Sequence, residues 1–141
     1  MSKKIVSTLA GLILLLGAAS VQAHSTLSNL IKVTVPFKFA VGGKTLPAGI
    51  YLVELNSERG TILLRTDGQQ PILILAMGKE SLAAPKHSQL VFHRYGTSFF
   101  LTEVWSQGNT AGRALATSDR EKELASKNRP NQEIVVEARN Q

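Results

Sequence analysis

The sequence predicts an all-β domain, mainly antiparallel, with about seven strands arranged as a sandwich or a small barrel and one short C-terminal α-helix. Short apolar runs alternate with turns rich in glycine and proline. The clearest run alternates apolar and polar residues with a period of two. One segment near the C-terminus carries a helix start signal. The 141 residues are 43% hydrophobic and include no cysteine, so the core must be stable without disulfides.

Residues 1–23 are typical of a secretory signal peptide. Lys3 and Lys4 give a positive start, Leu9 to Ala19 is an uncharged and mostly apolar run, and the sequence VQA ends at Ala23 as a cleavage site. A transmembrane anchor is the alternative, but a spanning helix needs about 20 apolar residues and this run is shorter. We therefore expect cleavage after Ala23.

Cleavage would leave a flexible tail over residues 24–29 and a single β-domain over residues 30–141. No later stretch has the length and apolarity of a transmembrane helix. The expected location is therefore the periplasm or the cell exterior. Cleavage would also remove Lys3 and Lys4 and lower the formal charge from +6 to +4. This positive excess would there favour an envelope glycan or another anionic surface as partner, whereas export argues against a nucleic acid.

The first predicted strand covers residues 31–41. Its odd positions are apolar and its even positions are polar or small, which predicts one buried and one solvated face. Pro36 cannot donate a hydrogen bond to a neighbouring strand, so it indicates an edge strand or a bulge.

Six further strands are expected at residues 50–55, 61–66, 72–77, 89–95, 99–105 and 133–139. Asp67-Gly68 predicts a tight hairpin with a type I′ turn. The strand at 72–77 is apolar at every position, which predicts that both of its faces are covered. Residues 106–113 are polar and contain glycine, and they are expected to form a loop.

The helix is predicted to run from Asp119 to Lys127 and to end before Pro130. Ser118 and Glu121 fit the N-cap and N3 positions of a capping box. Apart from a thin apolar face, the helix is charged, and its acidic and basic side chains are expected to be solvated.

Six phrases of the sequence form a recognisable pattern: Val33 to Phe39, Lys44 to Tyr51, Leu90 to Gly96, Phe100 to Trp105, Gly112 to Leu115 with Ser118, and Glu121 to Ala125. Together they resemble a family of small exported β-proteins abundant in acidobacteria. The resemblance spans most of the predicted domain, from Val33 to Ala125, and implies export and a single β-domain. No activity, cofactor or catalytic residue comes with it.

No catalytic motif is present. The chain contains no G-x-S-x-G, P-loop, H-E-x-x-H or G-x-G-x-x-G, and its acidic residues are scattered. We therefore predict a protein that is not an enzyme, has no catalytic residue and needs no cofactor.

Three histidines allow one metal hypothesis. After cleavage, the terminal amine and imidazole of His24 could chelate copper, with His87 or His93 as a further ligand. The favoured interpretation is that His24 is incidental and that the protein holds no metal.

His93, Arg94 and Glu103 lie on two neighbouring predicted strands. They could form an acid–base or anion-binding group. Adjacent residues of a strand point to opposite faces, so the three cannot share one pocket without a bulge. A structural ion pair between Arg94 and Glu103 that orients the two strands is the favoured interpretation.

The sequence therefore predicts an exported, non-enzymatic β-domain that serves as a structural or binding module of the cell envelope. The first alternative is a small β-barrel that carries one apolar ligand. A void inside the fold would favour the carrier. An interior filled by Phe37, Phe39, Phe92 and Trp105 would favour the module.

Overall fold

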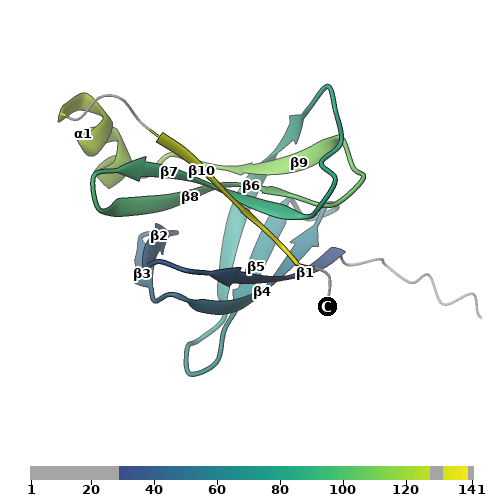
Figure 1. Cartoon of the computed structure of the whole chain (residues 1–141), viewed down its shortest axis with the longest axis horizontal. Coiled ribbons are helices and arrows are strands. Elements are labelled where there is room, and N and C mark those ends of the chain that lie inside the picture. Colours follow the sequence, from purple (N-terminus) through teal and green to yellow (C-terminus); the bar gives the residue numbers. More distant parts are fainter. Residues whose placement is uncertain (1–28, 128–131, 140–141) are drawn as a thin grey trace, which may run out of the picture.

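The computed structural model describes residues 29–127 and 132–139 (Figure 1). The described part of the chain is mostly strands with one short helix, in a sandwich-like arrangement whose mixed sheet is not closed. This confirms the predicted all-β class and its helix. The described strands number ten rather than about seven.

The bounds of the elements follow the chain from the N-terminal side. They are β1 (Asn29–Val35), β2 (Phe39–Val41), β3 (Lys44–Leu46), β4 (Gly49–Asn56), β5 (Thr61–Arg65), β6 (Ile72–Glu80), β7 (Gln89–Tyr95), β8 (Ser98–Trp105), β9 (Ala111–Leu115), α1 (Asp119–Lys127) and β10 (Gln132–Glu137).

The strands form two layers that share β6. The first layer is β1-β4-β5-β6, and every pair in it is antiparallel. The second layer continues from β6 through β9, β8 and β7 to β10, again antiparallel. The short β2 pairs with β8 in parallel and with β3 in antiparallel orientation, which makes the sheet mixed.

Strand β6 changes partners halfway along its length. Residues 72–75 pair with β5, and residues 76–80 pair with β9. At the change, the amide of Ala76 donates to the carbonyl oxygen of Gly60 at 2.8 Å. The strand thus passes from one layer into the other without a break in its backbone pairing.

The predicted facing of the first strand is confirmed. Ile31, Val33 and Val35 are buried, and the even positions between them are exposed. The predicted run of 31–41 is nevertheless two strands, because β1 ends at Val35 and β2 begins at Phe39. Pro36 lies at this break, where the chain leaves β4 to reach β8, and β1 is the edge strand of its layer.

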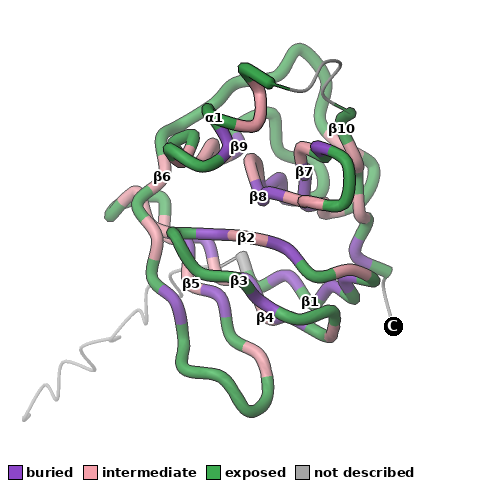
Figure 2. The backbone as a smooth tube through the Cα atoms, turned by 90° about the vertical axis from the view of Figure 1, so that its left-hand side faces the viewer, coloured by how far each residue is buried: buried purple, intermediate pink, exposed green. Residues whose placement is uncertain are grey.

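The two layers enclose a hydrophobic core in which aromatic side chains pack against one another. Phe39 contacts Phe92 and Tyr51 with ring centroids 5.3 and 5.1 Å apart, and Phe37 packs against Phe92 at 4.9 Å. Figure 2 shows buried stretches of the strands where the layers face each other. Three of the four aromatic residues expected in the interior, Phe37, Phe39 and Phe92, therefore lie in it. Trp105 lies instead on the outer side, against Gly112.

The prediction that residues 72–77 are covered on both faces is wrong. Leu73, Leu75 and Met77 are exposed, because α1 lies over β7 and leaves the outer face of β6 open. Part of the expected loop at 106–113 belongs to β9, and the short β3 was not predicted. Both strands have weak apolar patterns.

The hairpin at Asp67-Gly68 is correctly placed, but its turn type is wrong. Pairing of β5 with β6 ends at Leu64 and Ile72, so the connection is longer than two residues. Only Gly68 has a positive φ, 74°, whereas a type I′ turn needs two such residues.

The N-terminal predictions are only partly covered by the structure. Asn29, expected in the flexible tail, begins β1. The signal peptide at 1–23 and the rest of the tail lie outside the described residues. In the described ranges, no helix is long and apolar enough to cross a membrane.

The helix starts where the sequence predicts. The amide of Glu121 donates to the Ser118 hydroxyl at 3.2 Å, and the amide of Lys122 donates to the Ser118 carbonyl at 3.0 Å. Ser118 is therefore the N-cap. The carboxylate of Glu121 does not complete the capping box, because it points into the protein and not back to Ser118.

Replacing Ser118 by alanine should lower the free energy of unfolding by about 1 kcal/mol, because one amide of the first turn loses its acceptor. Urea denaturation measures this change. The matched control is Thr117→Ala, which lies outside the helix and is exposed. Equal stability of the two variants would contradict the capping role.

Candidate functional site

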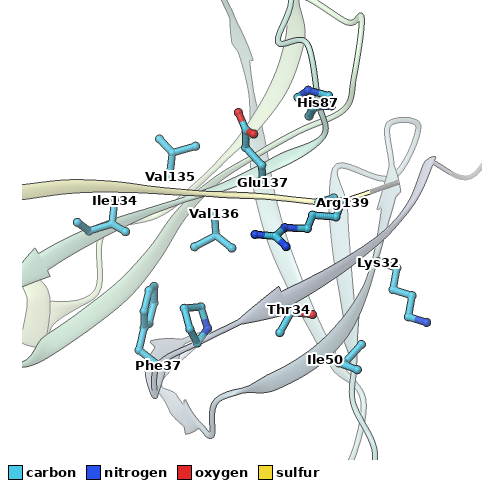
Figure 3. Close-up of a pocket in the computed structure, with 12 residues that line it drawn as sticks. Lys32, Thr34, Phe37, Ile50, His87, Ile134, Val135, Val136, Glu137 and Arg139 are labelled. Carbon is cyan, nitrogen blue, oxygen red and sulfur yellow. The ribbon is translucent and has the colours of Figure 1, made fainter. Parts of the chain in front are cut away.

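A groove lies where the open sheet fails to close. Among the described strands, β1 pairs only with β4 and β10 pairs only with β7, so each has one unpaired edge. The two strands come close without forming a ladder, and between them lies a groove of about 1210 Å³ (Figure 3). We call it the β1–β10 groove.

The floor of the β1–β10 groove is apolar. Phe37, Ile134 and Val136 line it and pack against the hydrophobic core. In Figure 3, Ile134 and Val136 point from β10 toward β1, whereas Val135 and Glu137 point to the other side of β10. The alternation of a strand therefore gives the groove its apolar floor.

The rim of the groove is mainly basic. Lys32, His87 and Arg139 line it together with one acid, Glu137. The side chain of Arg139 lies between the two strands in Figure 3, and Lys32 extends from the opposite side of β1. An anionic group at this rim would meet more positive than negative charge.

The backbone of the groove is equipped for strand pairing. In an antiparallel pair, every second residue directs its amide and carbonyl groups away from its partner. Residues of β1 therefore present such groups away from β4, and residues of β10 present them away from β7. Unpaired edges of this kind are templates for an added strand.

A second polar cluster lies beneath α1. Nδ1 of His93 is 2.7 Å from Oε1 of Glu121, and the Tyr95 hydroxyl donates to the same oxygen at 3.2 Å. Glu121 is only 3% exposed, so the expectation that the charged side chains of the helix are solvated is wrong for this residue. Burial raises the pKa of the Tyr95 hydroxyl, and the charge and hydrogen bond of Glu121 raise this pKa further.

The His93–Tyr95–Glu121 cluster ties the helix to β7. Within the described residues, His93 makes no hydrogen bond to a serine or threonine hydroxyl that could act as a nucleophile. The cluster therefore has the arrangement of a structural network. The one sequence signal for this cluster is helical spacing. Leu124 and Ala125 follow Glu121 by three and four residues, so all three lie on the same face of α1.

Substituting Glu121 by alanine should lower the free energy of unfolding by about 3 kcal/mol, because a buried hydroxyl and an imidazole lose their acceptor. Guanidinium denaturation measures the loss. The control is Glu123→Ala, whose exposed ion pair with Lys127 should contribute below about 1 kcal/mol. A loss no larger than that of the control would show that the buried cluster does not hold the helix.

The predicted ion pair between Arg94 and Glu103 is wrong. Arg94 Nε donates to the Gly96 carbonyl at 2.8 Å, and its guanidinium lies 5.5 Å from the Phe99 ring centroid. Glu103 instead pairs with Lys79 on β6.

The pairing register explains this correction. A bulge between Val91 and Phe92 places Val91 opposite Glu103 and Phe99 opposite Arg94. Glu103 also accepts a hydrogen bond from Trp105 Nε1 at 2.8 Å, so its carboxylate faces β6 and the indole.

The three histidines of the copper hypothesis have separate surroundings. His24 lies outside the described residues, His87 lines the β1–β10 groove, and His93 contacts Glu121. His87 lies in the loop before β7 and lines the groove, whereas His93 lies on β7 beneath α1, so the two belong to different sites. No group of three or more metal-binding side chains occurs in the described ranges. That the protein holds no metal stays the prediction, and copper at His24 stays its alternative.

Comparison of the chain with family models, curated proteins and solved structures found no match in any of the three. The functional argument therefore rests on the geometry of the β1–β10 groove and of the His93–Tyr95–Glu121 cluster.

Proposed function

We propose that the protein is an exported, non-enzymatic binding module of the cell envelope, and that its β1–β10 groove binds an extended segment of another polypeptide. The observation that carries this proposal is the pair of unpaired strand edges that border an apolar floor. A polypeptide in extended conformation supplies both the amide and carbonyl groups for these edges and the alternating side chains for the floor.

A polypeptide fits the groove better than a glycan does. Neutral sugar rings commonly stack on an open aromatic face, and among the residues that line the groove only Phe37 is aromatic. Its ring is stacked on Phe99 with centroids 3.9 Å apart, so one face of it is already covered.

The charged side chains at the rim of the groove favour polypeptides that carry acidic residues. The basic side chains of Lys32, His87 and Arg139 outnumber the single acid, Glu137. They favour a segment that carries aspartate or glutamate beside its apolar residues. The net positive charge, +4 once Lys3 and Lys4 are removed with the signal peptide, adds a weaker attraction of the same sign.

The carrier alternative has less support. An apolar ligand would need an enclosed interior, whereas the sheet is not closed and aromatic side chains fill the space between the layers. The groove lies at the seam of the sheet and is open to solvent on one side (Figure 3).

Peptide binding tests the proposal. The probe is a labelled peptide of about ten residues, the upper length of ordinary strands, in which valine alternates with threonine and glutamate. We expect binding by fluorescence anisotropy, and at least about tenfold weaker binding to an Arg139→Glu variant. Lys44→Glu, an exposed lysine outside the groove, is the matched control.

Two further probes separate the possible ligands. The same peptide methylated at every backbone nitrogen of its central residues should not bind, because no amide hydrogen is left to pair with a strand edge. Binding of an acidic oligosaccharide but not of the peptide would contradict the proposal. Equal binding of the plain and methylated peptides would also contradict it.

Export is the second part of the proposal and has its own measurement. The charged start, the apolar run and the VQA site predict a secreted product that begins at His24. Intact mass of the protein recovered from the periplasm or medium measures the processing. A full-length product retained in the membrane would contradict export by a cleaved signal.

A further inference from the structure

The outer face of the first layer carries a row of exposed apolar side chains. Leu73, Leu75 and Met77 on β6 are 67%, 78% and 64% exposed, and Leu30 and Ile50 are more than half exposed. We call these five residues, with the half-buried Leu52 and Leu63, the outer leucine face. Soluble monomers rarely expose an apolar area that extends across several strands.

The strand register makes this face continuous. Leu63 lies opposite Leu73 on one side and Glu54 on the other, and Glu54 lies opposite Leu30. Side chains directly opposite each other on neighbouring strands are in contact distance. No described element covers this face, since α1 packs over β7 in the other layer (Figure 1).

The polar residues of the outer leucine face have both signs. Arg65 and Glu54 approach each other to 3.8 Å, and Lys32 lies two strands away from Arg65, beyond Leu52. A face that combines acidic and basic groups within an apolar surface can be complementary to itself after a two-fold rotation.

We propose that the outer leucine face is an interface with a second copy of the chain, packed face to face about a two-fold axis. Two sheets packed in this way interdigitate their side chains at a spacing of about 10 Å. The exposed leucines of each copy would cover those of the other, and Glu54 of one copy would lie near the basic groups of the other.

An anionic lipid surface fits this face less well. Glu54 lies in the middle of the apolar row and would be repelled by such a surface, whereas Arg65 and Lys32 would be attracted to it. The outward positions of the four strands also include no tryptophan, tyrosine or phenylalanine, the residues typical of membrane-interface contacts. A second copy of the chain carries both acidic and basic groups on this face, and packing against it does not require aromatic residues.

The expected dimer is weak, because a face of four strands is only about 20 Å wide. Self-association should therefore appear in the micromolar range. Sedimentation equilibrium of the full-length gene product, as processed by the expression host, should show a monomer–dimer equilibrium up to high micromolar concentration.

Leu75→Glu is the decisive variant, because it places a charge at the most exposed position of the face. We expect it to weaken the dimer by about 30-fold or more. Leu82→Glu is the matched control: Leu82 is a fully exposed leucine in the loop after β6, and the substitution is the same. Far-ultraviolet circular dichroism and thermal unfolding of both variants check that the fold is retained.

Several results would overturn the dimer. They are a monomer at every concentration, equal association of the two glutamate variants, and binding to phosphatidylglycerol vesicles that Leu75→Glu abolishes. The last result would assign the face to lipid. Leu75 lies on β6, away from the β1–β10 groove, so the variant should still bind the acidic peptide probe. The test of the dimer and the test of the groove can therefore fail independently.

Discussion

Val35→Asp is expected to lower the free energy of unfolding by about 4 kcal/mol or more, the largest loss of any substitution considered. Val35 is 0% exposed and lies in the core, whose cluster of buried residues includes no basic residue to pair with a new carboxylate. A loss of this size approaches the lower end of the stability of typical domains, about 5–15 kcal/mol. Near-ultraviolet circular dichroism and the denaturation midpoint measure it.

Thr34→Asp provides the control on the neighbouring residue. Thr34 lies on the exposed face of β1, so the same substitution should change stability by less than about 1 kcal/mol. Comparable losses in the two variants would mean that the facing of β1 is not as described.

Gly112→Ala is expected to have the second largest effect. The Trp105 ring lies so close to Gly112 that a Cβ atom there would be 2.4 Å from a ring carbon, with two more ring carbons within 2.7 Å. The ring is buried, and its Nε1 donates to Glu103, so it cannot move without loss of that bond. Overpacking of this kind costs about 3 kcal/mol.

The indole itself reports the result. Trp105 is the only tryptophan of the chain, so a red shift of its emission would show that the ring has left its buried position. The control is Gly78→Ala on β6, where the nearest atom is the flexible end of Arg113 at 3.5 Å. Removal of the indole in a Trp105→Leu background should reduce the cost of the added methyl group. Gly112→Ala without loss of stability or shift of emission would contradict the packing.

The sequence predicts local features of this fold well. Ile31, Val33 and Val35 were placed inward from their spacing alone, since the alternation of a strand depends only on its own residues. The start of α1 followed from Ser118, because an N-cap bonds within one turn of the chain.

Features that depend on distant segments could not be predicted in this way. The apolar run of β6 was expected to be covered, but which face a helix covers is decided by α1, some forty residues later in the chain. Lys79 became the partner of Glu103 through the order β6-β9-β8 and the register around the bulge in β7. Neither of these is visible in local periodicity.

The β1–β10 groove could not be predicted for the same reason, because it depends on segments that are distant in the sequence. Its floor and rim come from the two ends of the described chain, which approach only after both layers have formed. The residues that line it are ordinary strand residues in the sequence, and only the failure of β1 and β10 to pair makes them a site.

The shared strand β6 makes the unfolding of the domain cooperative. Its first half is hydrogen-bonded to β5 and its second half to β9. Loss of pairing in either layer therefore disturbs the half of β6 that belongs to the other layer. The two layers should therefore behave as a single foldon, and amide hydrogens in β5 and β9 should exchange through the same global opening. A protease would then find the interior of either layer only when the whole domain opens, which suits a protein expected to work outside the cell without disulfides.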